Sequence, residues 1–272
     1  MHVVVLSRRT VKTTHKNYCN NFAPSMAKYA HDTVVPFKES GENKKQQVAE
    51  MFNDIAFRYD FMNRFLSAGI DVTWRKKAIL QLKDLQPKYM MDVATGTGDV
   101  AIMANQILNP AKITGIDISD GMLEMGREKI KKLGLENKIE LLSGDSETIH
   151  FSDNSFDAIT VAFGVRNFQN LEKGLSEMYR VLKPGGKLIV LEFSKPKNGF
   201  FKGFYNLYMN YIAPGFGKLF AKNRSAYQYL NDSVQKFPEG ENFVKILDGT
   251  GYKLTKYQQL TFGICSVYSG SK

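Results

Sequence analysis

Between residues 89 and 193 the sequence alternates short apolar runs with amphipathic runs, and this alternation allows very few folds. We expect the short apolar runs to be strands, at Tyr89–Ala94, Ile113–Ile118, Ile139–Leu142, Phe156–Phe163 and Lys187–Phe193. We expect the runs with helical spacing to be helices, at Val100–Leu108, Gly121–Leu133 and Leu171–Leu182. Strands that alternate with helices indicate right-handed βαβ units and a parallel sheet.

The C-terminal end of the sequence departs from this alternation. Two further strands are expected at Tyr252–Leu260 and Ile264–Tyr268, with only the segment 261–263 between them. So short a connection cannot hold a crossover helix, so the two strands are expected to form an antiparallel hairpin. The predicted fold class is therefore α/β, with a doubly wound, mostly parallel, seven-stranded, Rossmann-like sheet that ends in an antiparallel hairpin.

We expect one domain over residues 41–272, a length that suits a single α/β unit. Cap helices are expected within residues 44–82, because apolar residues there recur at offsets of three and four. A helical lid is expected as an insertion over residues 199–240. Residues 1–40 are expected to be a tail, either disordered or not translated.

The first 25 residues of this tail are basic and contain no acidic residue. An organellar targeting peptide has such a composition, and so do codons upstream of a true start at Met26. We favour the second interpretation, because no amphipathic periodicity runs through residues 3–21.

Charge and hydropathy limit the class of partner. Residues 1–31 carry five Lys or Arg side chains and no acid, so they supply half of the formal net charge of +10. The remaining chain is only moderately basic, which argues against a nucleic-acid partner and suits an anionic membrane surface. No apolar run approaches the roughly 20 residues needed to cross a bilayer. We therefore expect a cytoplasmic protein in peripheral contact with the inner face of the membrane.

The two cysteines, Cys19 and Cys265, lie in the tail and in the last expected strand, so we expect no disulfide and a reducing compartment. Neither they nor the four histidines show metal-ligand spacing, and no metal site is expected.

A glycine-containing turn, residues 92–99, follows the first expected strand and reads Asp-Val-Ala-Thr-Gly-Thr-Gly-Asp. Glycines there let the backbone approach a ligand closely and expose amides at a helix N-terminus. Asp117 ends the next strand, where an acid can accept hydrogen bonds from both hydroxyls of a ribose. The turn lacks the third glycine of a dinucleotide site, so adenosine without a diphosphate fits better. The structural alternative for Asp117 is a turn or helix-capping acid.

The third expected strand ends in Gly144-Asp145-Ser146. Because strand ends in doubly wound folds meet at one crevice, Asp145 and Ser146 are expected to contact an adenine edge. A plain polar turn is the alternative. The three features, a glycine turn, a ribose acid and an adenine turn, follow one another at successive strand ends. In this order they indicate an adenosine site more specifically than any one of them does alone.

At this point the sequence resembles the demethylmenaquinone/ubiquinone C-methyltransferase family (UbiE/MenG type), from about residue 44 to the end. The stretches that carry the resemblance are Met51–Ala56, Tyr59–Asn63, Asp71–Arg75 (Asp-Val-Thr-Trp-Arg), Phe163–Asn167 (Phe-Gly-Val-Arg-Asn), Arg180–Gly186, Leu191–Ser194, Tyr227–Ser233 and Phe237-Pro238. The resemblance implies the class I methyltransferase fold, S-adenosylmethionine as cofactor, and C-methylation of the ring of a polyprenylated quinol.

The cofactor-binding residues expected from the turn and the resemblance together are Asp92, Thr95, Gly96, Gly98, Asp117, Asp145 and Ser146. Two positions depart from the family pattern. Asn53 stands where the family often has Asp, and Ser146 stands where Ala is common, which leaves the side-chain role at 145–146 open.

The expected acceptor is demethylmenaquinol, the naphthoquinol of menaquinone biosynthesis. The alternatives are the benzoquinol of the ubiquinone pathway and another lipophilic phenol. Against a nucleic-acid substrate, the sequence has no base-flipping element. A cofactor-binding accessory protein without turnover is a further alternative, and the intact motifs argue against it.

Arg166 and Asn167 are the expected catalytic residues. A phenol ring carbon becomes nucleophilic as the adjacent hydroxyl loses its proton, and a positive charge or a hydrogen-bond donor nearby stabilises the phenolate. The structural alternative for Arg166 is an ion pair with a structural carboxylate.

The expected substrate-binding residues are Tyr59, Phe163, Phe204 and Tyr208. The last two belong to an aromatic helical face within residues 199–213, which either packs on the domain or also admits the isoprenoid tail beside a membrane.

Overall fold

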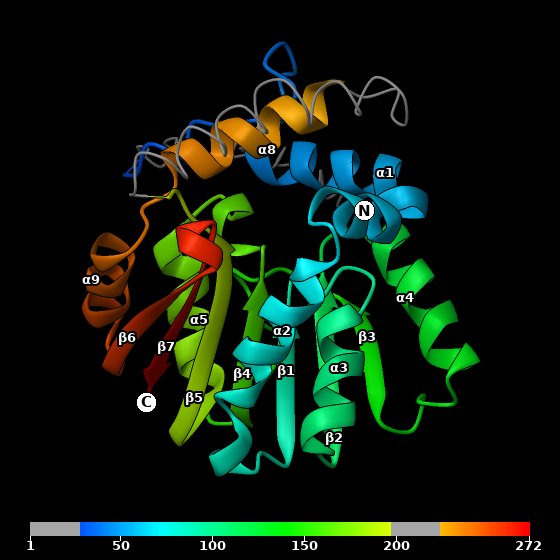
Figure 1. Cartoon of the computed structure of the whole chain (residues 1–272), viewed down its shortest axis with the longest axis vertical. Helices are drawn as coiled ribbons and strands as arrows, with labels where there is room; N and C mark the ends of the chain where they lie inside the picture. The colour runs from blue at the N-terminus through cyan, green and yellow to red at the C-terminus, as the bar shows by residue number, and fades with distance from the viewer. Residues whose placement is uncertain (1–27, 197–223) are drawn as a thin grey trace, which may run out of the picture.

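The computed structural model describes residues 28–196 and 224–272 (Figure 1). Its helices are α1 (Lys44–Leu66), α2 (Ile70–Leu80), α3 (Asp99–Leu108), α4 (Asp120–Lys132), α5 (Leu171–Val181), α8 (Arg224–Lys236) and α9 (Glu241–Thr250). Its strands are β1 (Tyr89–Val93), β2 (Lys112–Asp117), β3 (Ile139–Ser143), β4 (Phe156–Ala162), β5 (Leu182–Phe193), β6 (Lys253–Leu260) and β7 (Cys265–Ser271).

The seven strands form one sheet in the order β3-β2-β1-β4-β5-β7-β6. The pairs among β1 to β5 are parallel, and β7 pairs antiparallel with both β5 and β6. The predicted fold class, including the terminal hairpin, is confirmed. Strand order reverses between β1 and β4, and in open sheets ligands bind beyond the carboxyl ends of strands at such a point.

One boundary was predicted wrongly. The sequence Pro184-Gly185-Gly186 suggested a loop before a strand that begins at residue 187, whereas β5 begins at Leu182 and includes these residues. The register pairs Phe156 with Leu182 but Ala158 with Lys187, so the extra residues of β5 bulge out of the ladder. A bulge tolerates proline and glycine because its extra residues have no partner on β4, and Gly185 and Gly186 bond to the backbone of Lys272 instead.

Both faces of the sheet are buried, as the alternation of side chains along its strands requires. Met91, Val93 and Leu188 belong to the core under α5 and α9. Met90 and Ile189 belong to the opposite core, under α2, α3 and α4. The sheet is therefore a rigid support, and its carboxyl edge is the part that is available to bind a ligand.

Helices α1 and α8 lie across that edge (Figure 1). A short segment precedes α1, and part of it falls in the range expected as a tail. Its residues His31 and Val34 are buried, and Lys28 donates a 2.6 Å hydrogen bond to Glu172 of α5. Among the described residues, no helix combines the length and the apolar character needed to span a membrane.

Candidate active site

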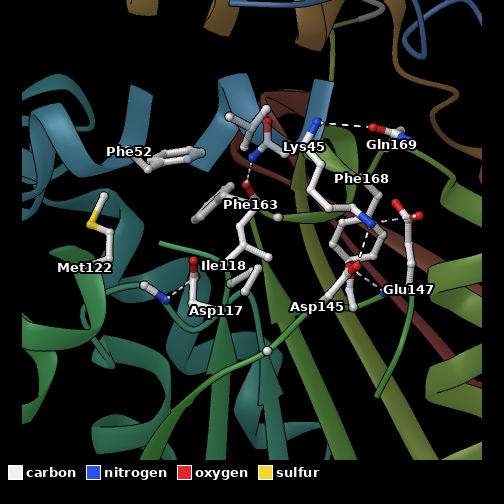
Figure 2. A pocket seen from close by; sticks show the side chains of 18 of the residues that line it. Lys45, Phe52, Asp117, Ile118, Met122, Asp145, Glu147, Phe163, Phe168 and Gln169 are labelled. Atoms are coloured by element: carbon white, nitrogen blue, oxygen red, sulfur yellow. Dashed lines mark hydrogen bonds and ion pairs between the residues drawn. The ribbon is translucent and has the colours of Figure 1, made fainter. Parts of the chain in front are cut away.

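A cavity lies between α1 and the carboxyl ends of β1, β2, β3 and β4 (Figure 2). Its free space, including its open mouth, is about 650 Å³. Its wall consists of Lys45, Val48, Phe52, Tyr59, Ala94, Gly96, Asp117, Ile118, Met122, Gly144, Asp145, Ser146, Glu147, Ala162, Phe163, Gly164, Asn167, Phe168 and Gln169.

The turn after β1 forms one side of the cavity. Gly96 and Gly98 have φ values of +55° and +77°, which glycine adopts without steric cost. Ala94 has a φ of +53°, and so strained a backbone at a non-glycine residue is typical of functional sites. Of these residues Ala94 and Gly96 line the cavity, and Gly98 instead caps the N-terminus of α3.

Asp92 lies beneath this turn and is almost fully buried. Its carboxylate accepts 2.6 Å hydrogen bonds from the hydroxyls of Thr95 and Thr160. Burial raises the pKa of Asp92 to about 6, against the opposing effect of these hydroxyls. Neither Asp92 nor Thr95 lines the cavity, so both shape the turn from below instead of facing a ligand.

Asp117, at the end of β2, does line the cavity. One carboxylate oxygen accepts the amide of Gly96 at 2.8 Å, and the other accepts the amide of Ser119 at 2.9 Å. Burial raises the pKa of Asp117, while these backbone hydrogen bonds oppose the shift. The carboxylate is therefore fixed in orientation, and it keeps lone pairs for a ligand in the cavity.

The turn after β3 forms the opposite side. One oxygen of Asp145 accepts the amide of Glu147 at 2.9 Å, and the other lies 2.5 Å from the ammonium of Lys45 (Figure 2). Glu147 also pairs with Lys45, at 3.2 Å. Ser146, between the two acids, is buried at the cavity wall.

The turn after β4 forms another side of the cavity. Phe163 has a φ of +57°, and its ring packs on Phe193 at 4.5 Å between centroids. Asn167 lines the cavity. Its side-chain oxygen accepts a 3.0 Å hydrogen bond from the hydroxyl of Tyr229, and its amide group donates to the carbonyl of Phe163 at 3.4 Å. Two contacts thus hold the amide of Asn167 in place.

Arg166 does not line the cavity. Its side chain is 6% exposed, pairs with Glu192 of β5 at 2.9 Å, and donates to the carbonyl of Phe163. Glu192 is fully buried. This geometry matches the structural alternative, an arginine that holds the turn by an ion pair, and direct contact between Arg166 and a ligand is not supported.

Tyr59 of α1 lines the cavity, next to Phe52, whose ring it meets edge-on at 5.8 Å. The predicted residues Phe204 and Tyr208, and the proposed lid segment 199–213, lie outside the described residues. Asn53, the departure from the family pattern, accepts hydrogen bonds from the hydroxyl of Ser119 and the amide of Gly121. It therefore joins α1 to the first turn of α4.

Sequence reasoning missed several cavity residues. Lys45, Val48 and Phe52 lie at offsets of three and four on α1, and that spacing indicated only a buried helix face. Glu147 follows the predicted Asp145 by two residues. The argument that placed Asp145 at the crevice, its position after the third strand, could have included Glu147. Nothing local distinguishes Lys45, because its partners are 100 and 102 residues away.

Comparison with known proteins gives a consistent result. The model of the ubiE/COQ5 methyltransferase family matches residues 40–272. The demethylmenaquinone methyltransferase of Bacteroides fragilis is 47% identical over 244 residues, which are 90% of this chain and 99% of that protein. The ubiquinone/menaquinone biosynthesis C-methyltransferase UbiE of Geotalea daltonii is 46% identical over 84% of this chain and 97% of that protein.

Among solved structures, a SAM-dependent methyltransferase of Thermotoga maritima has a TM-score of 0.57 at 19% identity. The match covers 82% of this chain and 98% of that one. At this identity the likeness concerns the fold alone.

Proposed function

The chain belongs to the ubiE/COQ5 methyltransferase family, and from this premise we propose that it transfers a methyl group from S-adenosylmethionine to a ring carbon of demethylmenaquinol. The observation that carries the proposal is the cavity, which brings a fixed carboxylate, Asp117, and a fixed amide, Asn167, to one space beneath α1.

The residues present fit S-adenosylmethionine. Asp117 would accept hydrogen bonds from the ribose hydroxyls, because its carboxylate is oriented by two amides and faces the cavity. Asp145 and Ser146 would lie at the adenine edge, and Gly96 lets the backbone approach the ligand. Asp92, Thr95 and Gly98 would support the cofactor indirectly, by holding the shape of the turn.

When bound, S-adenosylmethionine supplies an electrophilic methyl group on a sulfonium. The work left to the chain is to orient the acceptor ring and to favour the loss of its hydroxyl proton. We assign Asn167 to the quinol oxygen, where its amide donates a hydrogen bond to the developing phenolate. Arg166 is a positioning residue, which holds the Phe163–Asn167 turn through Glu192. Phe163 and Tyr59 would pack against the ring and exclude water.

The acceptor ring is tested by comparing two soluble quinols. We expect faster methylation of a short-chain demethylmenaquinol than of the corresponding demethylated benzoquinol, because the more similar relative is named for the naphthoquinol reaction alone. Product formation is followed by mass spectrometry. A higher kcat/KM for the benzoquinol would reverse the assignment of the acceptor.

We also propose peripheral contact with the cytoplasmic face of a membrane, where a polyprenylated quinol resides. Phe57 and Phe61 of α1 are 83% and 58% exposed. On a helix they lie opposite the cavity-lining residues Phe52 and Tyr59, since each residue advances by 100°.

Replacing both Phe57 and Phe61 by serine should lower the binding of the chain to anionic phospholipid vesicles by about tenfold or more, because two aromatic side chains no longer enter the interface. Vesicle co-sedimentation measures the change. Leu254→Ser is the matched control, since Leu254 is 83% exposed but lies at the opposite, amino edge of the sheet. Equal binding by the parent and the double variant would remove α1 from the membrane interface.

A further inference from the structure

The inner face of α1 covers the cavity. Lys45, Val48, Phe52 and Tyr59 lie at successive offsets of three, four and seven residues, so they share one side of the helix, and all four line the cavity. A ligand held by Asp117 and Asp145 would therefore have α1 above it (Figure 2).

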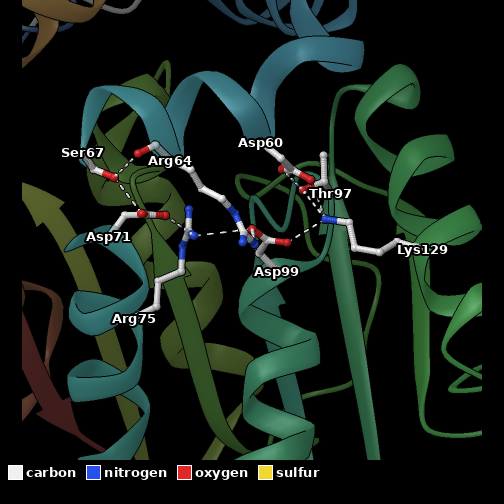
Figure 3. A network of polar contacts seen from close by, with 8 residues as sticks. All are labelled: Asp60, Arg64, Ser67, Asp71, Arg75, Thr97, Asp99 and Lys129. Atoms are coloured by element: carbon white, nitrogen blue, oxygen red, sulfur yellow. Dashed lines mark hydrogen bonds and ion pairs between the residues drawn. The ribbon is translucent and has the colours of Figure 1, made fainter. Parts of the chain in front are cut away.

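The C-terminal part of α1 is held by a bridge that we call the Lys129 bridge, formed by Lys129, Asp60 and Asp99 (Figure 3). The ammonium of Lys129 in α4 lies 2.6 Å from Asp60 of α1 and 2.6 Å from Asp99 of α3, and it also donates to Thr97 at 3.2 Å. None of these residues lines the cavity.

The Lys129 bridge is extended on one side. Arg75 pairs with Asp99 at 3.4 Å and with Asp71 at 2.5 Å, and both Arg75 and Asp71 are buried in α2 (Figure 3). Three helices of the domain therefore hold this end of α1. A network of this kind resists opening more than a single pair does.

The N-terminal end of α1 is held by a smaller bridge, the Lys45 bridge, formed by Lys45, Asp145 and Glu147. Its distances are 2.5 Å and 3.2 Å, and the side chains of Lys45 and Asp145 are 29% and 28% exposed. All three residues line the cavity. The two bridges are 15 residues apart along α1, or roughly 22 Å along its axis, with the other cavity-lining residues of the helix between them.

We propose that the side chain of Lys45 closes the cofactor cavity at its adenine end, so that breaking the Lys45 bridge opens that end and sets the rate at which cofactor and product leave. The inference rests on the proposed function, because it takes S-adenosylmethionine and S-adenosylhomocysteine as the ligands. The movable element is the side chain of Lys45, which is 29% exposed. The helix itself stays in place at this end, because the buried ammonium of Lys44 donates to the carbonyls of His31 and Arg166.

The charges at this end agree with such a role. Burial lowers the pKa of Lys45, but its bond with Asp145 and the charge of Glu147 outweigh burial, so the pKa is raised and Lys45 stays cationic. Glu147 is held in turn by the amide of Asn170, at 2.8 Å, so the acidic half of the bridge is fixed to the domain. The movable half is the lysine on α1.

The experiment measures dissociation of S-adenosylhomocysteine from the full chain by stopped-flow, for the parent, Lys45→Met, Lys45→Arg and Lys112→Met. Lys45→Met should release the ligand about tenfold faster, with a melting temperature close to that of the parent. Lys45→Arg keeps the charge and should stay within about threefold of the parent. Lys112→Met is the matched control, because Lys112 pairs with Glu140 at 3.2 Å on the surface, away from the cavity, and its loss should change nothing.

The salt dependence of the release rate provides a second readout. If Lys45 had only a structural role, Lys45→Met would not alter this salt dependence. Raising the ionic strength from about 0.05 M to about 1 M screens a partly exposed ion pair, so release from the parent should accelerate toward that of Lys45→Met. Release from Lys45→Met should be nearly independent of salt. Parallel salt dependence in both proteins would overturn the proposal.

The outcomes separate this inference from the function on which it rests. If the parent does not bind S-adenosylhomocysteine, both the proposed cofactor and the closing role of Lys45 are wrong. If the parent binds and Lys45→Met releases the ligand at the parental rate, only the closing role of Lys45 is wrong.

Discussion

Replacing Arg166 by methionine should lower the free energy of unfolding by about 3–5 kcal/mol, the cost of leaving a buried charge without its partner. Glu192 is fully buried, and its ion pair with Arg166 at 2.9 Å is the neutralising contact. Chemical denaturation measures the loss. Because the same pair holds the Phe163–Asn167 turn, turnover and cofactor affinity should fall together, which distinguishes a positioning residue from one that acts only in the transition state.

A matched double variant tests the cause of this loss. Arg166→Met combined with Glu192→Met removes both charges and should recover at least half of the lost stability, since a buried ion pair replaced by apolar side chains is often close to neutral. If the double variant is as unstable as Arg166→Met alone, the loss comes from packing and not from an unpaired carboxylate.

The pH dependence follows from Glu192. Burial raises its pKa above the ordinary 4.5, and Arg166 opposes that shift. A carboxyl whose pKa rises on folding costs no stability below its unfolded pKa; the cost grows as the pH rises from the unfolded to the folded pKa and is constant above it. Without Arg166 the folded pKa is higher still. The stability gap between the parent and Arg166→Met should therefore be small near pH 4.5 and largest at neutral pH and above.

Replacing Asp117 by alanine should weaken S-adenosylmethionine binding at least tenfold in titration calorimetry. Two ribose hydrogen bonds to a charged acceptor are worth about 2–4 kcal/mol together. The variant also leaves the amides of Gly96 and Ser119 without their acceptor, so the turn after β1 loses its fixed shape.

Asp120→Ala is the control for this measurement. Asp120 is exposed at the first turn of α4, close enough to raise the pKa of Asp117, but it does not line the cavity. Its removal should leave affinity within about threefold. An Asp117→Ala variant that binds as tightly as the parent would mean that the ribose does not lie at the end of β2.

The sheet could be predicted from the sequence because its signals are local. Strands β1 to β5 contain short apolar runs, and glycine or an acid marks the carboxyl ends of β1, β2 and β3, at Gly96, Asp117 and Gly144. Residues at the ends of neighbouring parallel strands meet without any further information, because the topology alone brings them together. For that reason Asp117, Asp145 and Asn167 were expected at one edge, and they do line one cavity.

What the sequence could not predict depends on partners far apart in the chain. Arg166 and Glu192 are 26 residues apart, on neighbouring strand ends. An ion pair was the stated alternative for Arg166, but the turn alone could not say which carboxylate would be its partner. The one available signal was a glutamate inside the apolar run of β5, which has to be neutralised if it is buried. Residues 28–40 were assigned to the tail for a different reason. His31 and Val34 are buried, but no periodic apolar pattern around them indicated this from the sequence.

The central claim is tested most directly by one measurement. The chain is incubated with S-adenosylmethionine that carries a ¹³C-labelled methyl group and with a short-chain demethylmenaquinol, and the product is examined by NMR. We predict a labelled methyl group coupled to a ring carbon, which shows that a carbon–carbon bond has formed. A labelled methyl on the quinol oxygen, or no transfer by a chain that binds the cofactor, would contradict the account.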